Sequence, residues 1–267
     1  LYSHERYSQQ PTPREVSSQA RTMLHQVLGD DGAAEIANNE IFRLHIVADR
    51  FRGLQAGSPR WQQAAWLGAS ATLNGLSRRS LNWFLERTLF TNLGDQSPWL
   101  YLDDIATTTV KLQTENVVDA LIASGSIPFV LEAVTEIAGA RPGLYWDGGI
   151  SDYHFDLPFL EGDDLVLYPH FQGRVVPGWF DKHLPWRHAS ASNYDNVVLL
   201  APSPEFVARL PRGKLSDRND FKTLEYHERV EVFQEVLSRS QMLADDFAAL
   251  VSGTINPDSI KPIGNVR

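Results

Sequence analysis

Five short apolar runs, each about the length of one β-strand, are separated by segments with helical periodicity in this chain of 267 residues. The runs are rich in β-branched and aromatic side chains and lie at 42–48, 107–112, 144–146, 165–168 and 197–201. Between and after them, 117–122 and 221–251 carry apolar residues at three- and four-residue steps, the period of an amphipathic helix. Strands that alternate with helices predict an α/β fold with a largely parallel sheet and helices on both faces.

Composition limits the kind of protein this is. The formal net charge of −9 provides no domain-wide positive field to attract phosphates, so we expect no nucleic-acid partner. The chain has no cysteine, which excludes disulfides, thiol nucleophiles and cysteine-ligated metals and fits a reducing compartment; we therefore predict a cytoplasmic protein. No run of about 18 apolar residues is present. The length fits one domain over residues 1–267.

One acid stands in an unusual setting. Asp147 ends the apolar run at 144–146 and is followed at once by Gly148 and Gly149. A glycine pair allows backbone angles closed to other residues and leaves space for another group to approach the carboxylate. The alternative is an Asp-Gly turn with no chemistry, which is the commonest use of this dipeptide.

The segment before this acid contains a second turn. The helix predicted over 117–122 should end near Ser124 and Gly125, with Pro128 just beyond. A small-residue turn therefore precedes the strand that ends in Asp147.

These two turns together resemble two sequence blocks of the patatin-like lipid acyl hydrolases. The resemblance is to the bacterial type of patatin-like phospholipase. The first block is Ala-Ser-x-x-x-Pro, matched at 123–128, and the second is the Asp-Gly-Gly of the catalytic acid, matched at 147–149. The resemblance implies a three-layer sandwich and a serine hydrolase that cleaves lipid acyl esters by a Ser-Asp dyad without a cofactor. Asp147 would accept the serine proton, while Ser124, Gly125, Pro128, Gly148 and Gly149 would shape the pocket wall and its turns. Asp152 and Asp156 have no matching place in the dyad.

The family carries its nucleophile in a Gly-x-Ser-x-Gly elbow, and this motif does not occur in the sequence. The nearest approach, at 68–72, lacks the second glycine and follows a helical pattern, whereas an elbow needs a strand in front; we interpret Ser70 as structural. We therefore expect the chain to be the carboxyl-terminal portion of a patatin-like catalytic domain, with its serine upstream and little activity alone. The alternative function is a catalytically inactive patatin-like domain that binds lipid or protein.

Residues 57–94 form the segment least expected from the resemblance, and we predict a helical, lid-like insertion there. The segment has three tryptophans, four arginines and one acid, Glu86, so its charge is positive within an acidic chain. One interpretation is a helical pair buried against the sheet or a second subunit. The other is a surface that contacts lipid peripherally, where tryptophan and arginine are both stable.

Three histidines lie close together in the sequence after the 165–168 run. His170, His183 and His188 follow no helical or zinc-ligand spacing, and no pattern of ligating carboxylates accompanies them. We predict no metal site and interpret this stretch as a packed aromatic loop.

Overall fold

The computed structural model describes residues 11–92, 97–159, 164–254, 260, 261 and 263. This part of the chain divides into two compact units: a larger unit of 11–164 and 175–195, and a smaller unit of 165–174 and 196–263. The prediction of one domain over 1–267 stays a prediction, because compactness does not establish that a unit folds independently.

The larger unit contains five α-helices, four strands and four 3₁₀ helices among its described residues. The α-helices are α1 (Pro13–Leu28), α2 (Gly32–Asn38), α3 (Arg60–Leu76), α4 (Val117–Ser124) and α5 (Gly149–Asp152). The strands are β1 (His45–Phe51), β2 (Leu85–Thr91), β3 (Thr107–Lys111) and β4 (Leu144–Asp147). The 3₁₀ helices are η2 (Arg78–Trp83), η4 (Pro98–Tyr101), η5 (Trp179–His183) and η6 (Ala191–Tyr194).

The four strands form one sheet in the order β3-β2-β1-β4. β1 is antiparallel to both of its neighbours, and β2 and β3 are parallel. The α/β class predicted from the sequence is confirmed, but this sheet is mixed rather than largely parallel. The difference arises because β1 and β2 are joined through helical segments yet run in opposite directions, a connection that strand and helix patterns alone do not specify.

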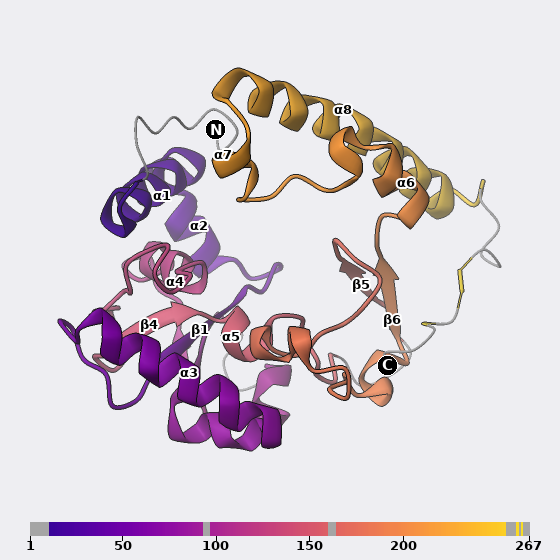
Figure 1. Cartoon of the computed structure of the whole chain (residues 1–267). Coiled ribbons are helices and arrows are strands. Elements are labelled where there is room, and N and C mark those ends of the chain that lie inside the picture. Colours follow the sequence, from indigo (N-terminus) through magenta and orange to yellow (C-terminus); the bar gives the residue numbers. More distant parts are fainter. Residues whose placement is uncertain (1–10, 93–96, 160–163, 255–259, 262, 264–267) are drawn as a thin grey trace. The chain divides into compact units, whose positions relative to one another are not determined.

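Helical elements pack on both faces of this sheet (Figure 1). On one face, side chains that include Ile46, Ala48 and Tyr145 form a core with α4. On the other face, Phe51, Leu85 and Trp146 are among those that pack with residues of η2, α5 and α3. The two cores separate in this way because successive side chains of a strand point to opposite faces.

Two predicted elements differ from the structure in their position. The strand predicted at 42–48 is β1, His45–Phe51, which runs three residues further along the chain. Its charged residues fit the strand because Arg50 forms an ion pair with Glu86 of β2 at 2.9 Å and Asp49 accepts a backbone hydrogen bond. Helix 221–251 is interrupted near Leu224 and becomes α7 (Asp220–Thr223) and α8 (Tyr226–Val251).

Helical structure extends through the predicted insertion 57–94 only as far as Trp83, and its lid-like role stays a prediction. α3 and η2 are helical, but Leu85–Thr91 is strand β2, an inner strand of the sheet whose seven residues are all buried. Glu86 and Arg87 interrupt the apolar residues of this strand, so 85–91 shows neither a continuous apolar run nor a strict alternation that would mark it as a strand in the sequence. Residues 93 and 94 lie outside the described part of the chain.

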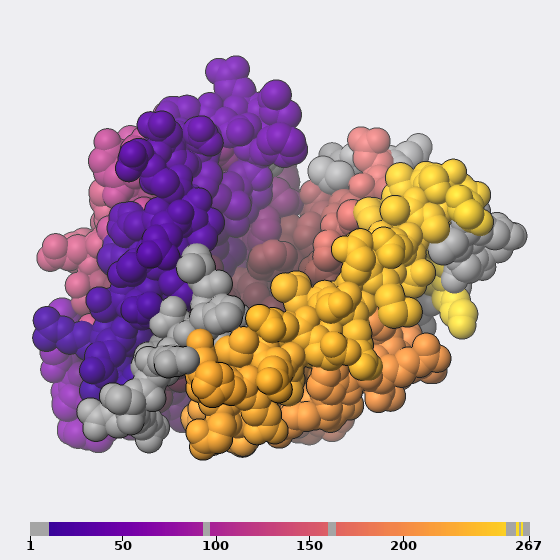
Figure 2. All heavy atoms as spheres, turned by 90° about the horizontal axis from the view of Figure 1, so that it is seen from above, coloured from indigo at the N-terminus to yellow at the C-terminus, as the bar shows by residue number. Residues whose placement is uncertain are grey.

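The smaller unit contains two parallel strands, β5 (Val166–Pro169) and β6 (Val197–Leu200). It also contains α6 (Pro204–Arg209), a 3₁₀ turn η7 (Pro211–Gly213), α7 and α8. Side chains of α8, orange to yellow in Figure 2, lie at the surface along much of the helix, and Leu237 is 74% exposed. The strands predicted at 165–168 and 197–201 thus correspond to β5 and β6.

We expect Leu89→Ala to lower the free energy of unfolding by about 3 kcal/mol, because Leu89 is fully buried in β2 and its truncation leaves a cavity. Chemical denaturation measures the change. The matched control is Trp83→Ala, whose exposed side chain lies in η2; its loss should change stability by less than about 1 kcal/mol. A small effect of Leu89→Ala would contradict the assignment of β2 to the core.

Candidate functional site

Asp147 is the last residue of β4, and its half-buried side chain lies on the sheet face that is covered by α4. Oδ1 of Asp147 accepts the backbone N–H of Gly149 at 2.8 Å. This contact closes an Asx turn, the local hydrogen bond that aspartate commonly makes two residues ahead. The Asp-Gly turn considered from the sequence is therefore present, and it fixes the direction of the carboxylate.

The second predicted turn lies directly beside Asp147. α4 ends at Ser124, and Gly125 caps the helix with its backbone N–H bonded to the carbonyl groups of its last turn. The carbonyl oxygen of Ser126 then accepts the backbone N–H of Asp147 at 2.9 Å. Pro128 follows and forms an isolated bridge with Leu131. The structure thus joins the two turns by a hydrogen bond between residues 21 positions apart.

The backbone of this second turn holds one strained residue that sequence patterns did not indicate. Phe129 has a φ of 67°, in the left-handed region where residues with bulky side chains are rare. Its ring lies 5.5 Å from the guanidinium carbon of Arg60, measured to the ring centroid. Strain of this kind persists only where the surrounding structure enforces it, and it clusters at functional sites.

Gly148 is required for close packing rather than for unusual backbone angles. Its φ of −63° and ψ of −15° are open to any residue. A Cβ atom at this position would lie 2.2 Å from the carbonyl oxygen of Val47 in β1, which no side chain tolerates. A Cβ atom on Gly149 would lie 3.0 Å from Oδ1 of Asp147. The space left by Gly148 is therefore taken up by the neighbouring strand, which corrects the expectation that it lies open beside the carboxylate.

Asp49, in the adjacent strand, is a second acid that sequence reasoning missed. It is fully buried; Oδ2 accepts the N–H of Ser151 at 2.8 Å, and Oδ1 has no hydrogen-bond partner among the described residues. Burial and the nearby Asp152 carboxylate raise the pKa of Asp49 well above its ordinary value. Asp49 pairs with Trp146 and not with Asp147, so the two acids lie on opposite faces of the sheet.

Two serines of the larger unit, Ser70 and Ser97, are buried. Ser70 lies inside α3, fully buried, and donates its hydroxyl to the carbonyl of Leu67 at 2.8 Å, as expected for a structural serine. Ser97 contacts a histidine, with Oγ 3.3 Å from Nδ1 of His45. Burial lowers the pKa of that histidine, but Ser97 is itself fully buried. A nucleophile must reach its substrate, so neither serine fits that role.

No group of three or more histidine, cysteine, aspartate or glutamate residues in the described ranges is arranged to hold a metal ion. Among the helices that the structure describes, none combines the length and the apolar character needed to cross a membrane.

No family model, curated protein or solved structure matches this chain.

We expect Asp49→Asn to gain stability relative to the unsubstituted protein as the pH rises. In the unfolded chain the Asp49 carboxyl loses its proton near pH 4, whereas its raised pKa keeps it protonated in the folded state. The folded state then binds more protons than the unfolded state, so stability falls with rising pH up to the raised pKa. Asparagine is neutral throughout and removes that loss.

Denaturant titrations of both proteins at pH 4.5 and pH 7.5 measure this change. Asp103→Asn is the control, because Asp103 is exposed and forms only a surface ion pair with Arg79. A stability difference between Asp49→Asn and the unsubstituted protein that is the same at both pH values would contradict a protonated Asp49.

Proposed function

We propose that this chain is the acid-bearing part of a patatin-like serine hydrolase that cleaves lipid acyl esters. Asp147 is the acid of its Ser-Asp dyad, and the nucleophilic serine lies in sequence upstream of these 267 residues. The observation that carries the proposal is the hydrogen bond from the Asp147 backbone N–H to the Ser126 carbonyl. This bond brings together the two turns, at 123–128 and 147–149, that carry the resemblance.

In this proposal the Asx turn orients the carboxylate that accepts the serine proton. Its hydrogen bond from Gly149 to Oδ1 holds the carboxylate at the end of β4, where a hydroxyl from another strand can approach. The carboxylate accepts the serine proton, directly or through one water, as the serine oxygen attacks the ester carbonyl. Asp147 gives this proton to the departing alcohol oxygen. Water then attacks the acyl-serine and passes a proton to Asp147, which returns it to the serine oxygen as the fatty acid is released. The residue pair needs no cofactor for these steps.

The proposal includes a patatin-like three-layer arrangement. Its support is the packing of helical elements on both faces of the four-stranded sheet, with α4 on one face and η2, α3 and α5 on the other. The mixed strand directions are a departure from the largely parallel sheet that we expected.

The alternative proposal is a patatin-like domain that binds lipid or protein without turnover. It explains the absence of Gly-x-Ser-x-Gly from the sequence without an upstream segment. The two proposals differ in one measurable respect. Replacement of Asp147 by a neutral residue abolishes ester hydrolysis in the enzyme, whereas a binding domain has no such activity to lose.

Both proposals include lipid contact through the helical part of 57–94, over a narrower surface than the sequence suggested. Arg78 and Arg87 are held in ion pairs with Asp104 and Asp152, so they are not available to meet anionic headgroups. Exposed large apolar side chains remain, at Trp61, Leu76 and Trp83. Tryptophan is favoured at membrane interfaces because its ring is apolar and its N–H is polar.

We expect the double substitution Trp61→Ala and Trp83→Ala to weaken binding to anionic phospholipid vesicles by about tenfold or more, as buried aromatic area is lost. Vesicle co-sedimentation measures the affinity. Trp186→Ala is the matched control, because this exposed tryptophan lies outside 57–94. Equal binding by all three proteins would exclude this surface as the lipid contact.

We expect Asp147→Asn to reduce ester hydrolysis by several powers of ten in the protein that includes the upstream sequence, with little change in melting temperature. Asparagine keeps the shape and the Asx turn but cannot take a proton from serine. Loss of a general base with its orienting role has effects of this size. Release of nitrophenol from acyl esters measures turnover.

Asp103→Asn is the control for this test, because Asp103 is exposed and its ion pair is with Arg79 rather than with either turn. The 267-residue chain alone should release no nitrophenol above background. Near-normal turnover in Asp147→Asn would reduce this residue to a turn former and end the hydrolase proposal. Turnover by the chain alone that Ser70→Ala abolishes would overturn the location of the nucleophile.

A further inference from the structure

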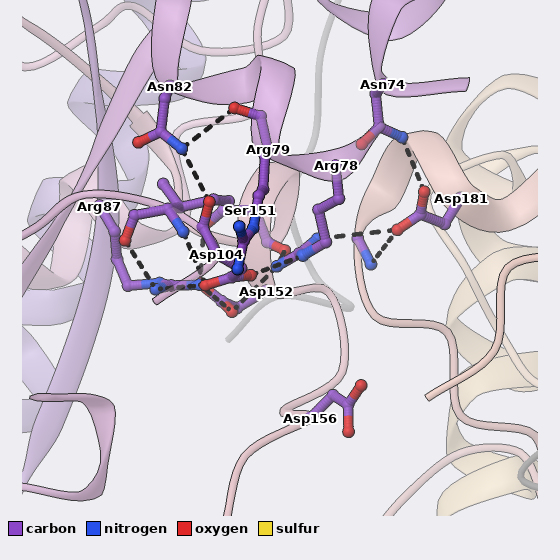
Figure 3. Close-up of polar contacts among 12 residues, drawn as sticks. Asn74, Arg78, Arg79, Asn82, Arg87, Asp104, Ser151, Asp152, Asp156 and Asp181 are labelled. Carbon is purple, nitrogen blue, oxygen red and sulfur yellow. Dashed lines mark hydrogen bonds and ion pairs between the residues drawn. The ribbon is translucent and has the colours of Figure 1, made fainter. Parts of the chain in front are cut away.

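The side chain of Arg87 in β2 is completely buried beneath the sheet face opposite Asp147. Its guanidinium binds Asp152 in a two-pronged ion pair, with Nε 2.6 Å from Oδ2 and Nη2 2.9 Å from Oδ1 (Figure 3). Paired parallel hydrogen bonds of this kind fix both distance and orientation. Asp152 is the last residue of α5, so this pair ties α5 to an inner strand of the sheet.

Further hydrogen bonds join Arg87 to Asp104 and, through Asp104, to a second arginine, Arg78. Asp104 accepts Nη1 and Nη2 of Arg87, each at 3.3 Å, and Nε of Arg78 at 2.7 Å. Arg78 in turn donates through Nη2 to the carbonyl of Ser151 at 2.7 Å. Figure 3 shows these side chains converging on α5 from β2, from η2 and from the loop before β3. Two arginines thus hold the last two residues of α5.

α5 depends on these contacts because it is a single turn of four residues, from Gly149 to Asp152. One turn of helix is unstable alone, since the cost of ordering it exceeds what one hydrogen bond returns. Here Asp152 donates its N–H to Gly148 O at 2.8 Å, while Ser151 donates its N–H to Asp49 and its hydroxyl to Oδ2 of Asp152 at 2.7 Å. The position of α5 is therefore decided by its buried partners.

α5 begins with the residue that orients Asp147. The N–H of Gly149, its first residue, is the donor to Oδ1 of Asp147. A continuous set of contacts therefore runs from Arg87 through Asp152 and the one-turn helix to the Asp147 carboxylate.

We propose that Arg87 and Asp152 are positioning residues for Asp147. The ion pair fixes α5, and α5 holds the Gly149 N–H that sets the direction of the carboxylate. The catalytic consequence depends on the proposed hydrolase function, whereas the structural consequence does not. Asp152 has no place in the dyad that the resemblance implies, but its buried ion pair gives it this structural role. Asp156 lies apart from this cluster and accepts hydrogen bonds from Ser190 and Asn193.

The test compares Asp152→Asn with Asp220→Asn. Asp220 is an equally buried acid in the smaller unit, where it pairs with Arg212 and Lys214, both at 2.9 Å. Each substitution removes one buried charge, but only Asp152 belongs to α5. We expect amide hydrogen exchange at Gly149, followed by NMR under native conditions, to become at least about tenfold faster in Asp152→Asn. Exchange at Gly149 should not change in Asp220→Asn.

The second measurement is ester hydrolysis by the protein that includes the upstream sequence. We expect kcat to fall about tenfold or more in Asp152→Asn with KM nearly unchanged, because a misdirected base slows the chemical step and not binding. Arg87→Lys is the second variant if Asp152→Asn does not fold, since lysine keeps the charge and cannot form both hydrogen bonds. It should accelerate Gly149 exchange in the same way.

Unchanged Gly149 exchange in a folded Asp152→Asn or Arg87→Lys protein would overturn the positioning role, whatever happens to kcat. Equal acceleration in Asp220→Asn would also overturn it, because the effect would then be a general loss of stability. Absence of ester hydrolysis from the unsubstituted protein would instead defeat the proposed function, and Gly149 exchange would still decide the positioning role.

Discussion

The buried guanidinium of Arg87 is the constraint on which the larger unit depends. Removal of a charge from water costs several kcal/mol for each ion, and only well-placed partners offset that cost. Those partners are Asp152 and Asp104, which come from α5 and from the loop before β3. The inner strand β2 can therefore be buried only when both of these segments are in place. Sheet and loops must assemble together, because any one of them without the others leaves an unpaired charge in the interior.

The ion pair of Arg87 also restricts the position of Asp147, although the two residues lie on opposite faces of the sheet. The backbone at Gly148 and Gly149 connects the two sides. Gly148 packs so closely on Val47 that a side chain has no room, and the Ser126 carbonyl holds the Asp147 amide. The turn is thus fixed by β1, by the segment after α4 and by α5. These three contacts hold the backbone of the turn, and the Gly149 N–H then fixes the direction of one carboxylate oxygen. Under the proposed function, this is the pre-organisation that a catalytic proton acceptor needs.

The two acids beneath the opposite face have different hydrogen-bond partners. Asp152 has a guanidinium with two aligned donors, whereas Asp49 receives one backbone N–H on one oxygen. Burial beside another carboxylate then raises the pKa of Asp49. The neutral form that this shift favours adds no second charge beside the ion pair of Arg87 and Asp152. The stability of the larger unit consequently depends on pH through Asp49.

The sequence alone determined the α/β class, the positions of β3 to β6, the end of α4 at Ser124 and the two adjacent turns, because hydrophobic period and turn residues act locally. It did not determine that 85–91 is an inner strand, since Glu86 and Arg87 interrupt its apolar residues and leave neither a continuous apolar run nor a strict alternation. It also did not distinguish Arg87 and Asp152 from surface charges. Their roles arise from contacts between residues 65 positions apart, and only the tertiary structure brings such groups together. Local pattern therefore located the candidate acid, whereas long-range burial of charge decided what holds it in place.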